Sequence, residues 1–267
     1  MKTVEYGKDH RDVIVLLHGG GLSWWNFQEA AELLQQDFRV VLPVLDGHAG
    51  SDREFTTIEA NAAAVIDYVE RHCGGHAALL GGVSLGGQIA AEILAQRPDI
   101  CRAAVLESVS AIPMPMTEKL VGPMMATSYG LIQKPWFARW QFQALGIDSR
   151  WYEDYYRDTC AISREDMTAF LRANAAYEAR RELACTAATA LVLVGEKETG
   201  QMRRSARKLQ ELIPDSVLEV LPGLGHGQYA INHGEGFAKK LEELLRETGG
   251  WSRSCSTPVM RCGRRIL

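Results

Sequence analysis

The chain has 267 residues, of which 46% are hydrophobic and 23% charged, and its formal net charge is −4. These values are typical of a globular protein with one large α/β domain, which can carry an inserted segment. The negative balance argues against a nucleic-acid-binding surface. No apolar run approaches the ~20 residues that a helix needs to span a bilayer. We therefore expect a small-molecule substrate, neither nucleic acid nor membrane as partner, and a monomer or a homodimer.

The N-terminal segment and the cysteines indicate the compartment. Met1–Asp12 is polar and charged, which is not typical of a secretory signal. The six cysteines are scattered and contain no Cys-x-x-Cys pair, so neither a zinc site nor a redox motif is indicated. We expect reduced thiols, a cytoplasmic protein, no metal site and no cofactor.

Short apolar runs alternate with helical patterns in the first part of the chain. Uninterrupted Val, Ile and Leu runs are typical of strands that are buried on both faces of a parallel sheet. They predict strands at 13–17, 38–42, 77–83 and 103–106. Helical spacing predicts helices at 25–36, 56–71 and 85–97, and Thr56 with Glu59 is interpreted as a capping box. This alternation favours an α/β domain with a mostly parallel sheet.

The pattern changes at residue 112, after which no strand is predicted until about residue 184. Pro113 and Pro115 break the chain there, Pro135 is typical of a first helical position, and Asp148 and Ser163 can cap helices, the last running to about 183. Strands return at 190–194 and 217–221, with helices at 202–212 and 236–247. We predict a core formed by 1–111 and 185–248 and a helical cap at 112–184. The basic tail 249–267 lacks periodicity, leaving disorder and irregular packing open.

The segment Gly82-Val83-Ser84-Leu85-Gly86 lies between a predicted buried strand and a helix. A Gly-x-Ser-x-Gly in this context is the signature of a nucleophile elbow, in which a tight turn exposes the serine hydroxyl. The crowded backbone requires small residues two positions before and after the serine. Ser84 is therefore predicted to be a nucleophile. A phosphate-binding turn or plain tight packing is the alternative for this segment alone.

Acyl transfer needs two backbone N–H donors for the developing oxyanion. One comes from the residue after the nucleophile, here Leu85, and the other from a glycine-rich loop after an earlier strand. His18-Gly19-Gly20-Gly21 follows the predicted strand 13–17. Gly20 is the first choice for the second donor, and Gly21 is the alternative.

A base and an acid can be assigned from the last two predicted strands. His226 lies in a glycine-rich loop after strand 217–221, and an imidazole with a near-neutral pKa suits a general base. A carboxylate after strand 190–194 can orient that imidazole. Glu198 is the preferred acid, and Glu196 and Glu107 are the alternatives. The order Ser84…Glu198…His226 differs from the orders in chymotrypsin and subtilisin.

These motifs, with Gly-His-Ala-Gly-Ser-Asp at 47–52, resemble the α/β-hydrolase superfamily over nearly all of 13–247. The resemblance implies an α/β-hydrolase fold, with helices on both faces of a mostly parallel sheet and an inserted helical cap. It implies a carboxylesterase-like serine hydrolase that forms an acyl-enzyme, from the branch that includes esterases and C–C bond hydrolases. Glutamate at 198 departs from the more usual aspartate.

Several functions remain open because one fold hosts many chemistries. A C–C bond hydrolase, a thioesterase or a lactonase would use the same serine and histidine, and a non-catalytic or single-turnover ligand receptor could keep them. Methionines and aromatic residues make the predicted cap apolar, among them Met116, Met124, Trp136 and Trp140. We expect most of them to be packing residues and the others to line a pocket for a hydrophobic acyl group.

Overall fold

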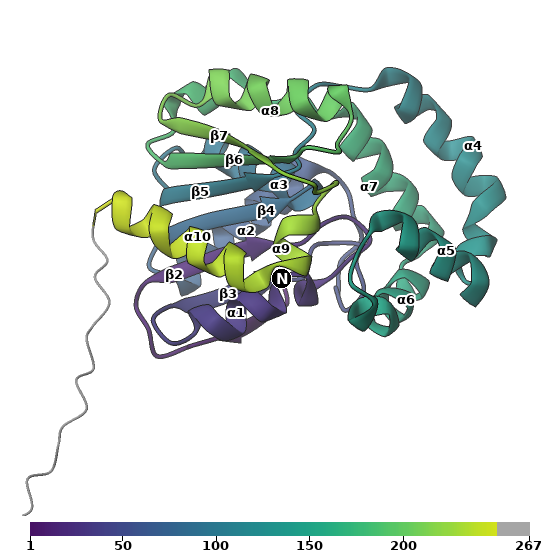
Figure 1. The fold of residues 1–267 in the computed structure, drawn as a ribbon, viewed down its shortest axis with the longest axis horizontal. Coiled ribbons are helices and arrows are strands. Elements are labelled where there is room, and N and C mark those ends of the chain that lie inside the picture. Colours follow the sequence, from purple (N-terminus) through teal and green to yellow (C-terminus); the bar gives the residue numbers. More distant parts are fainter. Residues whose placement is uncertain (250–267) are drawn as a thin grey trace, which may run out of the picture.

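Seven strands form a single sheet in a computed structural model that describes residues 1–249 (Figure 1). The strand order is β1-β3-β2-β4-β5-β6-β7; β1 is antiparallel to β3, and the other neighbouring pairs are parallel. The strands are β1 (Thr3–Tyr6), β2 (Val13–Leu17), β3 (Arg39–Pro43), β4 (Ala77–Val83), β5 (Cys101–Glu107), β6 (Thr189–Gly195) and β7 (Ser216–Leu221). The predicted mostly parallel α/β architecture is confirmed.

Helices cover both faces of this sheet, which explains the uninterrupted apolar runs. The core helices are α1 (Gln28–Leu34), α2 (Ile58–His72), α3 (Leu85–Gln96), α8 (Gly200–Leu212), α9 (Gln228–Asn232) and α10 (Gly234–Glu247). In β2, Val13 and Val15 pack in the cluster that includes residues of α2 and α3, whereas Ile14 and Leu16 pack with residues of α1 and α10. Alternate side chains of one strand therefore enter two separate layers of the core.

Two helix starts differ from the sequence-based expectation. The predicted helix 25–36 is a 3-10 helix, Trp24–Phe27, followed by α1. The N-cap of α2 is Thr57 rather than Thr56, because the Thr57 hydroxyl accepts a hydrogen bond from the Ala60 amide at 3.0 Å. The predicted capping box was wrong by one residue.

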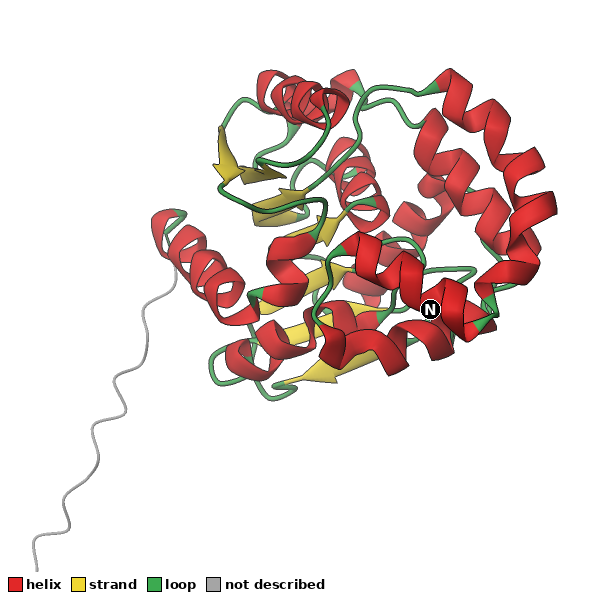
Figure 2. Cartoon of the chain, turned by 45° about the vertical axis from the view of Figure 1, so that its right-hand side comes forward, coloured by secondary structure: helices red, strands yellow, loops and turns green. Residues whose placement is uncertain are grey.

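The segment 112–184 connects β5 to β6, and its regular elements are all helices. Its elements are α4 (Pro115–Ile132), α5 (Pro135–Leu145), α6 (Tyr152–Ala161), α7 (Arg164–Ala176) and the 3-10 helices Ser149–Trp151 and Arg181–Cys185. Figures 1 and 2 show α4 to α7 grouped beside one end of the sheet. Its division from the core as a cap stays a prediction.

Within this segment, one helix was missed and one was overextended. Pro115 was expected to break the chain but begins α4, because proline fits the first turn of a helix, where no intrahelical N–H bond is needed. The helix that Ser163 caps ends at Ala176 rather than near 183. Ser163 caps α7 as predicted, since its side chain accepts a hydrogen bond from the Asp166 amide. Asp148 accepts one from the Arg150 amide but caps the 3-10 helix Ser149–Trp151, which leads into α6.

Several apolar residues of this segment do not pack as expected. Met116, Trp136 and Trp140 are 71%, 66% and 61% exposed, whereas Met125 and Tyr155 are buried.

No helix within residues 1–249 is long and apolar enough to cross a membrane. The predicted tail lies, apart from Gly249, outside the described residues.

Candidate active site

Ser84 occupies a sharp turn between β4 and α3. Its backbone has φ 53° and ψ −115°, in the left-handed half of φ space that non-glycine residues rarely adopt. A Cβ atom added at Gly82 would overlap the backbone of Gly86, and one added at Gly86 would overlap the carbonyl of Leu17. The strand and the helix approach each other so closely that both positions require glycine. This turn exposes the Ser84 hydroxyl at the carboxyl end of the central strand.

The structure brings Ser84, His226 and Glu198 into one chain of hydrogen bonds. Nε2 of His226 lies 2.9 Å from Oγ of Ser84, and Nδ1 lies 2.8 Å from Oε2 of Glu198. The Glu198 side chain is 1% exposed and the His226 side chain 47% exposed. The imidazole can therefore exchange protons with the serine while the buried carboxylate fixes its tautomer and orientation.

The Glu198 carboxylate is fully hydrogen-bonded. Its Oε1 accepts hydrogen bonds from the Gly195 amide and the Ser108 hydroxyl, both at 2.8 Å. Burial by itself raises the pKa of Glu198, but the hydrogen bond and charge of His226, with the bonds from Gly195 and Ser108, lower it below its ordinary value. Glu198 is therefore ionised at neutral pH, as a partner for an imidazolium must be.

The alternative acids Glu107 and Glu196 do not form a hydrogen bond with His226. The Glu107 carboxylate accepts hydrogen bonds from the amides of Tyr229 and Ala230, at 2.9 and 3.1 Å, whereas Glu196 accepts one from Gly223 at 2.7 Å. Complete burial raises the pKa of Glu107 to about 7, an effect that the two amide bonds only partly oppose. Both carboxylates thus hold the backbone on either side of His226.

Ser108 was missed by the sequence analysis. It directly follows β5 with φ 56°, and its hydroxyl donates to Glu198 while accepting a hydrogen bond from the Gly227 amide at 2.9 Å. It therefore links the acid to the loop of His226. The available signal was its position, since polar residues at the carboxyl ends of parallel strands face the ligand site.

The glycine-rich loop after β2 offers one free amide near Ser84. The Gly21 amide donates to Nε2 of His48 at 3.1 Å and so is engaged. The Gly20 amide makes no hydrogen bond to any described residue. Leu85 is the first residue of α3, and its amide has no partner inside the helix. The amides of Gly20 and Leu85 are thus free to donate hydrogen bonds to a ligand, whereas the Gly21 amide is engaged.

Two buried histidines support this loop. Nε2 of His18 accepts a hydrogen bond from the Leu45 amide at 3.1 Å, and the His18 and His48 rings meet edge to face with centroids 4.9 Å apart. Burial lowers the pKa of His18 to about 3 and that of His48 to about 4. Both rings are therefore neutral at physiological pH, which lets His48 accept the Gly21 amide bond.

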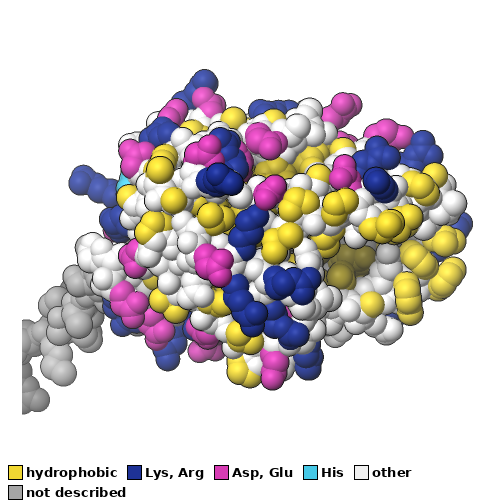
Figure 3. Space-filling model, turned by 90° about the horizontal axis from the view of Figure 1, so that it is seen from above, with side chains coloured by type: hydrophobic (Ala, Val, Ile, Leu, Met, Phe, Trp, Pro, Cys, Tyr) yellow, Lys and Arg dark blue, Asp and Glu magenta, His cyan; other side chains and the backbone are white. Residues whose placement is uncertain are grey.

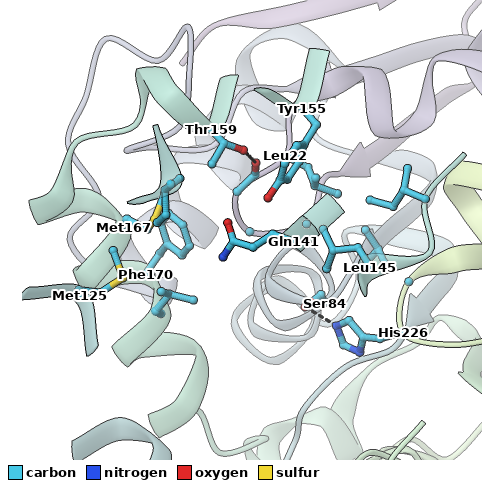
Figure 4. A pocket seen from close by; sticks show the side chains of 18 of the residues that line it. Leu22, Ser84, Met125, Gln141, Leu145, Tyr155, Thr159, Met167, Phe170 and His226 are labelled. Atoms are coloured by element: carbon cyan, nitrogen blue, oxygen red, sulfur yellow. Dashed lines mark hydrogen bonds between the residues drawn. The ribbon is translucent and has the colours of Figure 1, made fainter. Parts of the chain in front are cut away.

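Ser84 and His226 face a cavity of about 360 Å³ that the helical segment covers (Figure 4). The cavity is mostly apolar and is lined by Gly19, Gly20, Gly21, Leu22, Val83, Ser84, Met124, Met125, Ser128, Ile132, Gln141, Leu145, Ile147, Tyr155, Thr159, Met167, Phe170, Leu171, His226 and Gly227. No Lys, Arg, Asp or Glu of the described chain is among them. Its size and character suit a small neutral ligand with an apolar part.

Gln141 of α5 is a polar exception in this lining. Figure 4 shows its amide directed into the cavity, and the side chain makes no hydrogen bond to any residue within 1–249. The amide can therefore donate to or accept from a ligand. Sequence reasoning gave no signal for Gln141, because only the packing of α5 against the core directs it toward Ser84.

Solved structures with the same fold include several enzymes. An esterase from Thermogutta terrifontis has a TM-score of 0.75 and 21% identity, covering 92% of this chain and 93% of that one. The enol-lactonase from Burkholderia xenovorans LB400 has a TM-score of 0.77 and 18% identity, covering 92% and 96%. MenH from S. aureus has a TM-score of 0.74 and 19% identity, covering 92% and 98%. At these identities the likeness concerns the fold.

Two sequence comparisons complete the assignment. The polyketide synthase ThaQ of Burkholderia thailandensis is 28% identical over 246 residues, covering 88% of this chain. The chain spans only 12% of the length of that protein. The family model of the alpha/beta hydrolase family matches residues 14–240. The chain therefore belongs to the alpha/beta hydrolase family.

Proposed function

We propose that the chain is a serine hydrolase that cleaves a carboxylic ester of a small, apolar substrate through an acyl-enzyme. The observation that carries this proposal is the chain of hydrogen bonds from Ser84 through His226 to Glu198 beside an apolar cavity. Membership of the alpha/beta hydrolase family supports hydrolysis as the class of reaction.

In the first half of the reaction, Oγ of Ser84 attacks the ester carbonyl while Nε2 of His226 accepts the serine proton. The amides of Gly20 and Leu85 donate hydrogen bonds to the oxyanion, which develops only in the transition state. The Glu198 carboxylate stabilises the imidazolium. His226 then gives its proton to the departing alcohol, and the acyl group stays on Ser84.

The second half repeats these steps with water. His226 accepts a proton from the water as it attacks the acyl-enzyme, the same two amides hold the oxyanion, and the acid is released as Ser84 regains its proton. The same imidazole thus acts as base and as acid in each half. No step needs a cofactor.

The lining of the cavity favours a neutral acyl group. A substrate carboxylate buried there would lack a cationic partner, since no Lys or Arg of the described chain lines the cavity. This favours simple esters over carboxylate-bearing substrates for C–C bond hydrolysis or enol-lactone hydrolysis.

A thioesterase is the second candidate, because attack on an acyl thioester uses the same groups. The match to part of a polyketide synthase favours it, since polyketide synthesis is chemistry on acyl chains. Comparison of oxygen esters and thioesters with the same acyl group separates the two candidates by their ratio of kcat/KM.

The test measures hydrolysis of p-nitrophenyl esters of increasing acyl length by the wild type and by Ser84→Ala. We expect multiple turnovers by the wild type and a loss of roughly 10⁴-fold or more in kcat for the variant. Ser149→Ala, which changes an exposed serine outside the cavity, should retain activity.

Labelling with a fluorophosphonate identifies the nucleophile independently. Mass spectrometry should find the adduct on Ser84 in the wild type and none in Ser84→Ala. Undiminished turnover by Ser84→Ala contradicts the proposal. A single burst followed by a retained acyl adduct instead favours a ligand receptor on the same fold.

A further inference from the structure

Large apolar side chains form two exposed rows on neighbouring helices of the segment 112–184. We call these residues the apolar ridge. It consists of Met116, Leu120, Met124 and Leu131 on α4 and Trp136 and Trp140 on α5, which are 71%, 56%, 48%, 39%, 66% and 61% exposed. They are six of the ten large hydrophobic residues exposed in the described part of the chain. Such a concentration marks an interaction surface.

The ridge is not required to hold α4 in place, because another stripe does so. Val121, Met125 and Ile132 are buried in the cluster that includes Met167 and Phe170 of α7. At about 100° per residue, the ridge residues of α4 lie on a stripe beside this buried one. The residues that anchor α4 to the core and the residues of the ridge are therefore different sets.

The ridge adjoins the cavity of Ser84. Met124 belongs both to the ridge and to the cavity lining, and Gln141, which lines the cavity, directly follows Trp140. Figure 3 shows apolar side chains gathered around a hollow at this end of the molecule. A ligand that rests on the ridge thus has an apolar route to the nucleophile.

The charges of residues 115–145, which carry the ridge, are mainly positive, although the whole chain carries −4. Lys119 lies on α4, Arg139 lies on α5 and Lys134 lies between the two helices; all three are exposed, and Glu118 is the one acidic residue within 115–145. Within residues 1–249, none of the three cations forms an ion pair, and Arg139 lies over the ring of Tyr152. This surface therefore attracts anions.

We propose that the apolar ridge docks on an anionic lipid surface, from which an amphiphilic substrate reaches the cavity. Tryptophan and long apolar side chains, with unpaired cations nearby in the chain, are the groups by which helices lie in a membrane interface. Anionic headgroups complement the three cations. The docking itself does not rest on the proposed ester hydrolysis.

Other occupants fit the ridge less well. Two copies joined ridge to ridge would bring six cations together, which opposes association. A protein partner would need hollows matched to each projecting side chain, whereas lipid deforms around them. The expectation of no membrane partner came from the absence of a spanning run, and surface docking needs no such run.

Vesicle flotation tests the docking. The Ser84→Ala protein, which cannot consume lipid, is mixed with vesicles of phosphatidylcholine, with or without phosphatidylglycerol. We expect it to float with the anionic vesicles and to be released by salt. Adding Trp136→Ala and Trp140→Ala should lower the bound fraction by roughly tenfold. The matched control is Val217→Ala with Val220→Ala, which changes exposed apolar residues of β7.

Three results would overturn the proposal: no flotation of the Ser84→Ala protein, equal flotation of the tryptophan variant, or equal loss in the β7 control. A dimer that dissociates when Trp136 and Trp140 are replaced, without any binding to vesicles, would assign the ridge to a second copy. In the Ser84 background of the wild type, the tryptophan variant should keep its thermal unfolding temperature and its activity on a water-soluble acetate ester. Loss of that acetate activity would also contradict a role confined to docking.

Discussion

The carboxyl end of the sheet and the helical segment 112–184 differ in how completely their polar groups are hydrogen-bonded and in how much apolar surface they expose. At the carboxyl end of the sheet, the carboxylates of Glu198, Glu107 and Glu196 all accept hydrogen bonds from the protein. In the helical segment, the Gln141 amide has no partner within the described residues, and Trp136 and Trp140 face solvent. Groups that are fully paired fix the positions of reacting atoms, whereas unpaired groups remain available to ligands.

This contrast implies that substitutions at the carboxyl end of the sheet should impair chemistry or stability, whereas those in the helical segment should change which ligands are accepted. Among these substitutions, Glu198→Gln should impair the chemistry most severely. The amide has nearly the shape of the carboxylate but cannot stabilise the imidazolium, so we expect kcat to fall by about 10³- to 10⁴-fold with KM little changed. Steady-state kinetics on p-nitrophenyl esters measures the change.

The other two carboxylates supply matched controls for this substitution. Glu107→Gln and Glu196→Gln remove charge near His226 without removing its hydrogen-bond partner. Each should lower kcat far less than Glu198→Gln. An equal loss from Glu107→Gln would show that the proposed division of roles among the three carboxylates is wrong.

Glu107 should also make folding depend on pH. Its pKa is raised to about 7 in the folded protein, so the folded state keeps a proton that the unfolded state releases near its ordinary value of 4.5. The resulting stabilisation is complete below about pH 4.5 and is lost as the pH rises through about 7. We expect the advantage of the wild type over Glu107→Gln in free energy of unfolding to shrink by up to about 3 kcal/mol between about pH 5 and pH 8.

Urea unfolding at the two pH values measures this difference. Glu196→Gln is the control for loss of a carboxylate on the same side of the site, because that side chain is exposed. The lowered pKa of Glu198 acts in the opposite direction, and its contribution is lost only as the pH falls through that lowered value, outside this window. A constant difference between the wild type and Glu107→Gln would contradict the assignment of a raised pKa.

Gln141→Leu, in the helical segment, should give the smallest effect and change ligand preference only. Leucine cannot hydrogen-bond a ligand, so esters with a hydroxyl or carbonyl in the acyl chain should lose up to about tenfold in kcat/KM relative to plain esters of equal length. Gln143→Leu, on the same helix but outside the cavity lining, should leave the ratio unchanged. An unchanged ratio for Gln141→Leu would remove Gln141 from substrate selection.

The core was predictable because its signals are local. Each buried strand is a short apolar run, and the predicted strand 77–83 has the bounds of β4. The nucleophile elbow was predictable because a Cβ atom at Gly82 or Gly86 would overlap the backbone of the turn, so both positions require glycine. The helical segment was less predictable for two reasons. A proline can end a helix or begin one, as Pro115 does in α4. In addition, amphipathic spacing does not say which apolar stripe of a helix is buried.

The fold class, the serine on its turn and the order of the candidate catalytic residues could all be inferred from local patterns in the sequence. The carboxylate that meets His226 could be identified only from the folded chain, because Glu107 ends β5, Glu196 and Glu198 follow the neighbouring β6, and all three lie at the carboxyl end of the sheet. The tertiary structure also showed that the Gly21 amide is engaged by His48, 27 residues away in the chain, whereas the Gly20 amide is not hydrogen-bonded within the described residues. Contacts between distant segments depend on packing, which no local pattern of residues records.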